Sequence, residues 1–492
     1  MTAITVDIPP ELWQLIAFYL TDDQIWALRG KNRMLNNLAW DRQCYQISFP
    51  ITIKSLSERH LRHLERPFIS ERIHEILLAD YLYGHSFLER IFVRGIAQSR
   101  ASALSQRVRG LLKQSNPFKR LSPMLKNVSS MQIHWSMWAS NHLAMALTKR
   151  ALLTVQLFSE KLRFLTISLD PTPTSELLKS TYLPQLESLT LLRHSRMEYV
   201  ALSTTMNETI LPFLGRHHKT LKSFHSPRSG TFNMWYPESL QMSSDGMPLF
   251  ESLSLSFWCL QNGIHQTVHD FIASHSQSLN SLTLFVCANS IAVPPELLES
   301  PQTYLDLNLP HLTHLIVEHV RSSGEDCAIW FYRLANSIAH ACSETLIQLV
   351  INGGGLAYAS EQNLACTVWT NLKVLSIFVY ELDVQELDFM ANIKLFPTLE
   401  ELNLMKIWAF GASTNSTFEA DLSRRKYKRS KLRYLHAQTP LKGQMANFKA
   451  LVNTFPNLLL FNDVPKVEFL ENHNDERLVL IHDSIRVTSN VS

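Results

Sequence analysis

The sequence predicts an α/β protein in which a small N-terminal helical domain precedes a curved solenoid of repeated strands and helices. Three observations carry this prediction: a six-residue pattern, L-x-x-L-x-L, that recurs through most of the chain, segments of helical periodicity between its copies, and two apolar helices near the N-terminus. Apolar residues make up 46% of the 492 residues, which is enough for a long core. Charged residues make up only 18%, which indicates an extended buried surface or a partner that covers part of the outside.

The six-residue pattern is the main evidence for the solenoid. Clear copies begin at Leu162, Leu186, Phe250, Leu279, Leu312, Leu346, Leu372, Leu399 and Leu432, weaker copies begin at Val128, Leu221 and Leu458, and an earlier candidate begins at Ile73. From Val128 to Leu458 the mean interval is 30 residues, which leaves room for a helix after each strand. One such strand cannot bury its leucines alone, so neighbouring copies are expected to stack into a continuous core. In pattern, period and strand character, most of residues 70–465 resembles the leucine-rich repeat.

The N-terminal segment is predicted to form two helices. The first starts at Pro9-Pro10-Glu11 and runs to about Leu20, and the polar turn at residues 21–23 caps the second. The first helix is apolar almost all round, and a unit of about 40–50 residues has too little core to cover it on two sides. Part of its apolar surface is therefore expected to meet the rest of the chain or another protein.

The order of residues over about positions 5–48 resembles the F-box motif. The resemblance rests on a Leu-Pro-like pair, two short apolar helices and an acidic turn, with the residues Ile8, Pro9, Glu11, Leu12, Ile16, Leu20, Leu28, Asn32, Arg33 and Leu38. It implies that the segment binds a Skp-family adaptor, and through it a cullin, by way of Ile8, Pro9, Leu12, Ile16, Leu20 and Leu28.

The F-box resemblance, together with the repeats, implies the substrate-recognition subunit of an SCF-type E3 ubiquitin ligase. Such a subunit has no active site of its own, and its leucine-rich repeats bind an unknown protein substrate. The alternative is a leucine-rich-repeat interaction scaffold whose N-terminal helices only cap the solenoid. The two differ in whether the apolar N-terminal side chains are exposed.

Four segments are predicted along the chain. Residues 1–48 form the F-box-like helical domain, 49–127 a helical connector with a first irregular repeat, 128–466 the leucine-rich-repeat solenoid, and 467–492 a charged C-terminal tail outside the core. Residues 410–430 read as an insertion that ends in the basic run Arg424–Arg433. That run fits a nuclear-localisation signal, a small anion-binding patch or a solvated loop, and the sequence leaves these open.

No motif indicates a cofactor, a metal site or a catalytic centre. Gly353–Gly355 match no phosphate-binding pattern, His265 and His269 at i, i+4 have no evident third ligand, and the six cysteines are scattered. No apolar run is long enough to span a membrane, and a net charge of +3 does not favour nucleic acid as a partner. Without a recognisable signal peptide, the protein is expected in the cytoplasm or nucleus.

Strand alternation predicts which side chains face a substrate. Positions one, four and six of the pattern point inward, so positions three, five and seven face the concave side. Among the 33 such positions from the Val128 copy to the Leu432 copy there is no Lys or Arg. The candidate substrate-binding residues are His225, Ser254, Thr283, Phe285, His314, Glu318, Phe378, Glu401 and Tyr434. Because a phosphorylated segment is normally recognised by an arginine cluster, this face is predicted to bind an unmodified protein surface.

Overall fold

The computed structural model divides into two compact units, Met1–Leu221 and Lys222–Ser492. It describes residues 12–13, 20–29, 33–50, 62–79, 118–134, 141–168, 171–192, 206–226, 247–258, 264–287, 306–320, 325–353, 367–379, 381–405, 407, 409–410, 418–423, 425–439, 444–471 and 479. Within the helical connector predicted over residues 49–127, residues 51–61 and 80–117 lie outside these ranges, and α8 (Phe118–Leu121) follows them.

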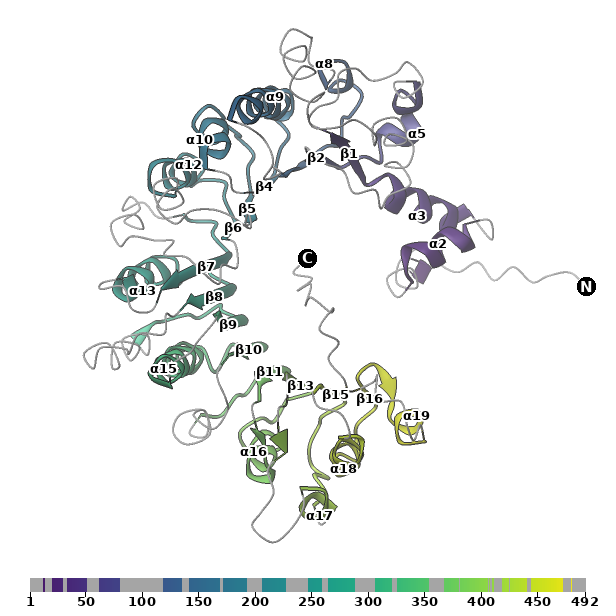
Figure 1. The fold of residues 1–492 in the computed structure, drawn as a ribbon, viewed down its shortest axis with the longest axis vertical. Coiled ribbons are helices and arrows are strands. Elements are labelled where there is room, and N and C mark those ends of the chain that lie inside the picture. Colours follow the sequence, from purple (N-terminus) through teal and green to yellow (C-terminus); the bar gives the residue numbers. More distant parts are fainter. Residues whose placement is uncertain are drawn as a thin grey trace, which may run out of the picture. The chain divides into compact units, whose positions relative to one another are not determined.

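The first unit passes from helices directly into a parallel sheet. Helices α2 (Asp22–Leu28) and α3 (Arg33–Cys44) are followed by the neighbouring strands β1 (Gln46–Pro50), β2 (Glu75–Ala79), β3 (Ser130–His134), β4 (Phe164–Ser168) and β5 (Ser188–Leu192). The connections contain α5 (Pro67–Ser70), α8, α9 (Asn141–Phe158) and α10 (Pro171–Lys179), and the π-helical turn η1 (Met206–Ile210) and α12 (Leu211–Arg216) follow β5. Within the unit, Figure 1 shows α9, α10 and α12 along one side of the strands.

The second unit repeats the same arrangement. Its parallel strands are β6 (Ser223–His225), β7 (Ser252–Trp258), β8 (Ser281–Cys287), β9 (His314–Val320), β10 (Gln348–Asn352), β11 (Val374–Phe378), β13 (Glu401–Met405), β15 (Tyr434–Ala437) and β16 (Leu460–Phe461). The helices are α13 (Ile264–Ser274), α15 (Glu325–Ala341), α16 (Val384–Met390), α17 (Phe418–Ser423), α18 (Met445–Thr454) and α19 (Lys466–Glu471), and β12 (Glu381–Leu382) pairs with β14 (Ala409–Phe410) in a small second ladder. Figure 1 shows α13, α15, α16 and α18 on one side of this unit's strands.

The end of the sheet is an antiparallel hairpin. After β16 the chain reverses at Asn462 and Asp463, whose φ angles of 46° and 64° form a tight turn. Strand β17 (Val464–Pro465) then pairs antiparallel with β16, so the parallel stacking stops here. The ring of Phe469 on α19 packs 4.3 Å from that of Phe461, which closes the last layer of the core.

The predicted leucine-rich-repeat solenoid is confirmed. Each copy of the pattern from Ile73 to Leu432 coincides with a strand and has buried side chains at its three inward positions. In the last copy Leu458 and Phe461 are buried, but the sixth position is the exposed Asp463 in the turn after β16. In the β8 repeat, for example, Leu279, Leu282 and Leu284 are all fully buried. Burial of apolar surface stabilises a fold by about 25 cal/mol per Å². The leucines of each layer are buried only when a neighbouring strand covers them.

The sheet begins earlier than the sequence indicated. Strand β1 was not predicted, yet Cys44 at the end of α3 and Ile47 and Phe49 of β1 take the same three inward positions and are buried. The pattern could not be recognised in the sequence here, because cysteine and phenylalanine occupy two positions at which leucine is usual. Strand β1 therefore crosses residue 48, the predicted end of the F-box-like domain.

The predicted C-terminal tail, which was expected outside the core, and the predicted insertion both contribute buried residues to it. Phe469 and Val479 fall in the predicted tail and are buried, and the Thr439 N–H donates to the Val479 carbonyl over 2.9 Å. In the predicted insertion, α17 packs beside α18, and the hydroxyl of Tyr427 donates to Asp388 over 2.8 Å. These parts of both segments are therefore folded against the repeats.

A glycine is required where β10 ends. Gly353 has a φ of 131°, a conformation that side chains disfavour, and a Cβ added there would lie 2.3 Å from Cβ of His319 on β9. The backbone of one repeat therefore passes directly over a side chain of the previous one. This explains the first glycine of the Gly353–Gly355 run by packing.

Replacing Gly353 tests this close approach. The Gly353→Ala variant is expected to unfold with a free energy lower by about 2 kcal/mol or more, because both the φ angle and the clash oppose a side chain. Urea unfolding of the full chain measures the change. Gly215→Ala is the matched control: nothing lies within 4 Å of its added Cβ, so stability should change by less than about 1 kcal/mol. Equal stability of Gly353→Ala and wild type would contradict the account.

Two buried histidines join backbone groups of neighbouring repeats. His217 accepts from the Leu183 N–H over 3.0 Å, and His275 accepts from the Met247 N–H over 3.3 Å, each through Nε2. Their Nδ1 atoms lie 2.7 and 2.8 Å from the carbonyls four residues earlier, which require a donor. Both rings are thus neutral, with the proton on Nδ1. Burial is the main cause that lowers the pKa of both rings.

Their protonation should destabilise the fold in mild acid. The neutral ring is favoured only in the folded state, so this stability is present above the usual histidine pKa of 6.5 and is lost as the pH falls below it. His275→Leu is expected to lower stability at neutral pH by about 1–3 kcal/mol and to flatten its decline between about pH 7.5 and pH 5.5. Urea unfolding at several pH values measures both. The exposed His311→Leu is the control, and a His275→Leu decline as steep as that of wild type would refute the assignment.

Candidate functional site

In the second unit, positions three, five and seven of the pattern point away from the core and form the predicted concave side, here called the outward strand face. The side chains on this face form unbroken rows. Because the register is regular from β7 to β15, equivalent residues of neighbouring strands lie opposite one another. The fifth positions form the row Ser254, Thr283, Ile316, Val350, Ser376, Asn403 and His436. The third positions form the row Ser252, Ser281, His314, Gln348, Val374, Glu401 and Tyr434.

The nine predicted substrate-binding residues all lie on this face. The register places His225 beside Ser254, Ser254 beside Thr283, Phe285 beside Glu318, and Glu401 beside Tyr434, whereas Phe378 lies apart from these on β11. His314 is exposed, Ser254 is buried, and the others are half-buried. Burial lowers the pKa of His225, so this ring is neutral near pH 7.

The two acidic residues of the face are held by amides. Asn403 donates through Nδ2 to Glu401 and to Ser376, over 2.9 Å in both cases, and Asn352 lies 3.5 Å from the Glu318 carboxylate. No Lys or Arg occupies a described outward position between β6 and β15. The face therefore presents hydroxyls, amides, imidazoles and aromatic edges, which suit an unmodified protein surface better than a phosphate.

The sequence analysis missed a polar network on the strand face of the first unit. The Glu75 carboxylate accepts from Gln46 Nε2, Ser130 Oγ and Gln132 Nε2 over 2.8 to 2.9 Å. These residues come from β1, β2 and β3. Glu75, Ser130 and Gln132 take positions three and five of the copies at Ile73 and Val128, so the pattern already placed them on one face, and only Gln46 required that β1 be recognised as a strand.

The N-terminal helices pack around a small core of their own. Leu20, Trp26 and Leu38 pack against the buried Ile25 and Ala39. Helix α2 begins with a capping box in which Thr21 and Gln24 exchange hydrogen bonds, as the predicted turn requires. This core occupies the inner surface of α2 and α3.

An aromatic ladder ties these helices to the first repeat. The ring of Trp40 lies 5.3 Å from that of Trp26 and 5.6 Å from that of Phe68, edge to face in both pairs. Arg72 lies 4.0 Å from the Phe68 ring and forms a 2.7 Å ion pair with Asp41. The ladder fixes one side of α3 against the segment between β1 and β2.

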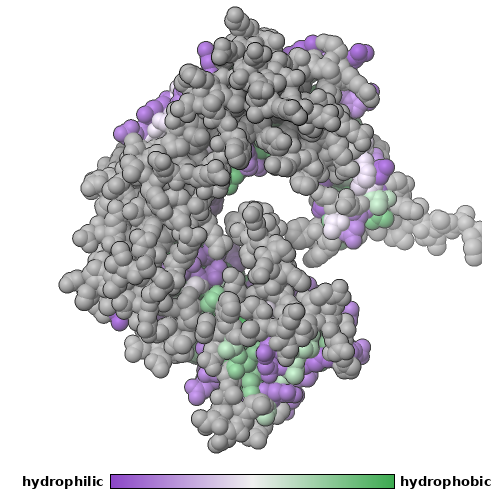
Figure 2. All heavy atoms as spheres, viewed as in Figure 1, coloured by the Kyte–Doolittle hydropathy of each residue, from purple (hydrophilic) through white to green (hydrophobic). Residues whose placement is uncertain are grey.

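Several apolar side chains of the N-terminal helices remain accessible. Leu12 is 48% exposed, and Trp13, Leu20 and Leu28 are half-buried. Figure 2 shows hydrophobic surface among hydrophilic residues here. The other three predicted adaptor-binding residues, Ile8, Pro9 and Ile16, lie outside the described residues. Of the predicted set, Leu12 is thus exposed, and Leu20 belongs partly to the helical core.

Among the residues that the structure describes, no group of three or more His, Cys, Asp or Glu is placed to hold a metal ion, and no helix is long and apolar enough to cross a membrane. His269 lies beside Asp270, 3.1 Å away. Burial raises the pKa of the Cys44 thiol to about 11 and also raises that of Cys342, so both are protonated near pH 7.

Comparisons with known proteins add no functional assignment. No protein-family model matches the chain, and no curated protein sequence matches it. Among solved structures, a chain of the crystal structure of the Rad7 and Elc1 complex in yeast is 16% identical, with 81% of this chain and 98% of that chain covered and a TM-score of 0.37. A likeness at this level carries no argument, so the repeat assignment depends on the strands themselves.

The composition of the strand face predicts binding that does not depend on phosphorylation. The relevant partners are the proteins that co-purify with the intact chain but not with the Phe378→Ala or Tyr434→Ala variant. These partners should still bind after they have been treated with phosphatase. Loss of an aromatic anchor should weaken their recovery by roughly tenfold or more. Tyr182→Ala is the control, since this tyrosine is 62% exposed on another part of the chain. Quantitative mass spectrometry measures the recovery. Partners whose recovery is unchanged by both substitutions but is lost after dephosphorylation would overturn the prediction.

Proposed function

We propose that this protein is a non-catalytic substrate-recognition subunit of an SCF-type E3 ubiquitin ligase. Its N-terminal helices bind a Skp-family adaptor, and through it a cullin, while its leucine-rich repeats bind the protein to be ubiquitinated. The observation that carries the proposal is the apolar surface left on the N-terminal helices, where Leu12 is 48% exposed. Exposed apolar side chains on a helix supply the apolar contacts of protein–protein interfaces.

Helix packing explains why this surface is available. Ile25 and Ala39 fill the interior between α2 and α3, and Trp40 and Phe68 fill the side toward the first repeat. Neither contact covers Leu12. The F-box resemblance of the sequence matches this surface to an adaptor.

The strand face of the second unit supports a protein as the second ligand. Half-buried aromatics such as Phe285 and Phe378 provide anchors, and hydroxyls and amides surround them. Positioning a substrate near a ligase requires binding and no reaction at this chain. Such a subunit acts in the cytoplasm or nucleus.

A second candidate is an interaction scaffold whose N-terminal helices only cap the solenoid. It is favoured by the direct passage of α3 into β1 and by the edge-to-face contact of Trp40 with Phe68. A capping helix shields the first layer of a repeat core, as α3 does for β1. The two candidates differ in whether Leu12 contributes to partner binding.

The Leu12→Asp variant tests the adaptor site. A charge placed in an apolar interface should weaken binding of a purified Skp-family adaptor by more than about tenfold, while the melting temperature stays close to that of wild type. Isothermal titration calorimetry measures the affinity. The matched control is Leu153→Asp, the same change at a leucine of α9 that is 43% exposed.

Two results would reject the adaptor site. Wild-type affinity in Leu12→Asp would show that this surface does not bind the adaptor. Loss of the cooperative melting transition in Leu12→Asp, with Leu153→Asp intact, would show that Leu12 belongs to the core and favour the cap.

A further inference from the structure

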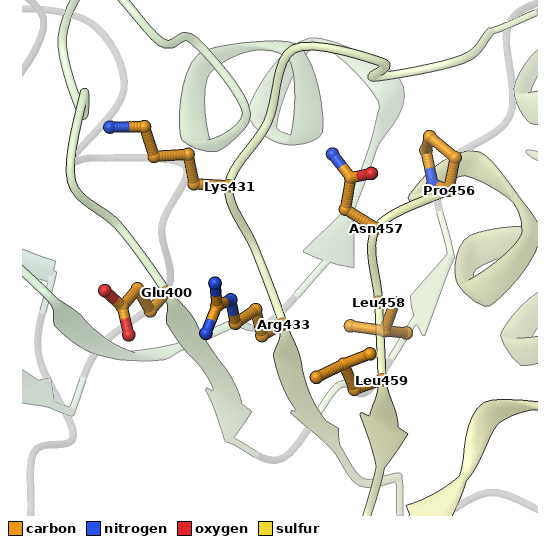
Figure 3. A pocket seen from close by; sticks show the side chains of 7 residues that line it. All are labelled: Glu400, Lys431, Arg433, Pro456, Asn457, Leu458 and Leu459. Carbon is orange, nitrogen blue, oxygen red and sulfur yellow. The ribbon is translucent and has the colours of Figure 1, made fainter.

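An open pocket lies where the chain enters the last parallel strands of the second unit. It has a volume of about 620 Å³ and is lined by Glu400, Lys431, Arg433, Pro456, Asn457, Leu458 and Leu459. Figure 3 shows these side chains on three neighbouring segments, those that lead into β13, β15 and β16. The pocket is therefore made by the edge of the sheet, apart from the outward strand face.

Backbone hydrogen bonds fix the spacing of this edge. The Arg433 N–H donates to the Glu400 carbonyl, and the Leu459 N–H donates to the Arg433 carbonyl, over 2.8 Å in both cases. All three residues take the second position of the repeat pattern. A carboxylate, a guanidinium and an aliphatic side chain are thus placed side by side at neighbouring strand entrances.

The two residues at the equivalent positions in the first unit form an ion pair with each other. Arg163 and Glu187 also take the second position in neighbouring repeats, and they form a two-point ion pair with distances of 2.6 and 2.9 Å. Glu400 and Arg433 form no ion pair with each other or with any other residue that the structure describes. The guanidinium of Arg433 is therefore available to a carboxylate from outside the chain.

The surroundings of the pocket carry unbalanced positive charge. Arg425 is paired with Asp388, and the Lys426 ammonium donates to the Asn453 carbonyl over 3.1 Å. Four other cations of the basic run, all exposed, have no side-chain partner among the described residues: Lys428, Arg429, Lys431 and Arg433. Burial and then the charge of Lys426 lower the pKa of Lys466, as expected beside clustered cations.

The pocket also has an apolar wall, which selects among anions. Leu459 is 54% exposed, although the neighbouring Leu458 is buried. An exposed leucine has neither a hydrogen-bond donor nor a charge with which to bind a phosphate group, and the Glu400 carboxylate repels a dianion. The lining has no aromatic ring on which a nucleic-acid base could stack.

We propose that this pocket binds an acidic segment of a partner protein. A carboxylate of the segment pairs with Arg433 and Lys431, and an adjacent aliphatic side chain packs on Leu459. Arginine can hold a carboxylate with two parallel hydrogen bonds, as Arg163 does with Glu187. The proposal does not depend on adaptor binding, and it assigns the unpaired part of the basic run to protein recognition.

Fluorescence anisotropy of the full-length protein tests the site. The probe is a fluorescein-labelled decapeptide of alternating glutamate and leucine, and the comparison probes are an all-glutamate decapeptide and inorganic polyphosphate. Arg433→Glu and Lys431→Gln should each weaken binding of the alternating peptide by roughly tenfold. Leu459→Ser should weaken this peptide by a few-fold and leave the all-glutamate peptide unchanged. Lys219→Glu, at an exposed lysine of the first unit, should have no effect.

Several outcomes would overturn the proposal. These are unchanged affinity in both Arg433→Glu and Lys431→Gln, equal weakening by Lys219→Glu, or binding of polyphosphate or the all-glutamate peptide as tight as that of the alternating peptide. Melting curves accompany each variant, and Lys431→Gln decides alone if Arg433→Glu does not fold. The Leu12→Asp variant should bind the alternating peptide like wild type, so failure of this proposal and failure of the adaptor site are distinguishable.

Discussion

Each strand of this protein buries apolar side chains that its own repeat is too small to cover. Leu282 and Leu284 of β8 are buried only because Leu253 and Leu255 of β7 and Leu315 and Val317 of β9 pack on either side. Stacking is therefore obligatory, and a strand without neighbours would expose its leucines to water. The same constraint makes the first and last layers the vulnerable ones, because each lacks a partner on one side.

The first and last layers of the repeats are covered in different ways. At the first layer, α3 runs into β1, and Trp40 on α3 packs against Phe68. At the last layer, the hairpin of β16 and β17 stops the parallel pairing, and Phe469 covers Phe461. The N-terminal helices can therefore serve as a cap and still bind a partner, since the surface around Leu12 is not used in either contact.

Most of the fold could be predicted from the sequence because the inward positions are chemically uniform. Leucine or another aliphatic residue recurs there at bounded intervals, and the spacing predicted both the strands and the face that each residue occupies. Strand β1 was missed because Cys44 and Phe49 replace leucines, and the contribution of Gln46 to the polar network around Glu75 was missed with it. The buried Phe469 and Val479 were missed because the apolar groups at residues 469–470 and 478–481 are short, lie among charged residues and do not continue the repeat pattern.

The proposed binding surfaces were less predictable than the fold. The sequence indicated the outward face and the exposed Leu12, since alternation and apolar excess are local properties. It could not show that Glu400 and Arg433 lie side by side without pairing, or that His217 accepts from a backbone group 34 residues earlier. Such contacts depend on how one repeat is placed on the next, which the pattern of one repeat does not contain.

The proposed function requires that the N-terminal helices bind an adaptor while the strand face of the second unit stays open for a substrate. Hydrogen–deuterium exchange of the intact protein, with and without a purified Skp-family adaptor, measures both requirements. Exchange is expected to slow within residues 12–40 and to stay unchanged in β7 to β15. Protection of those strands, or no protection of the N-terminal helices at saturating adaptor, would refute the proposed function.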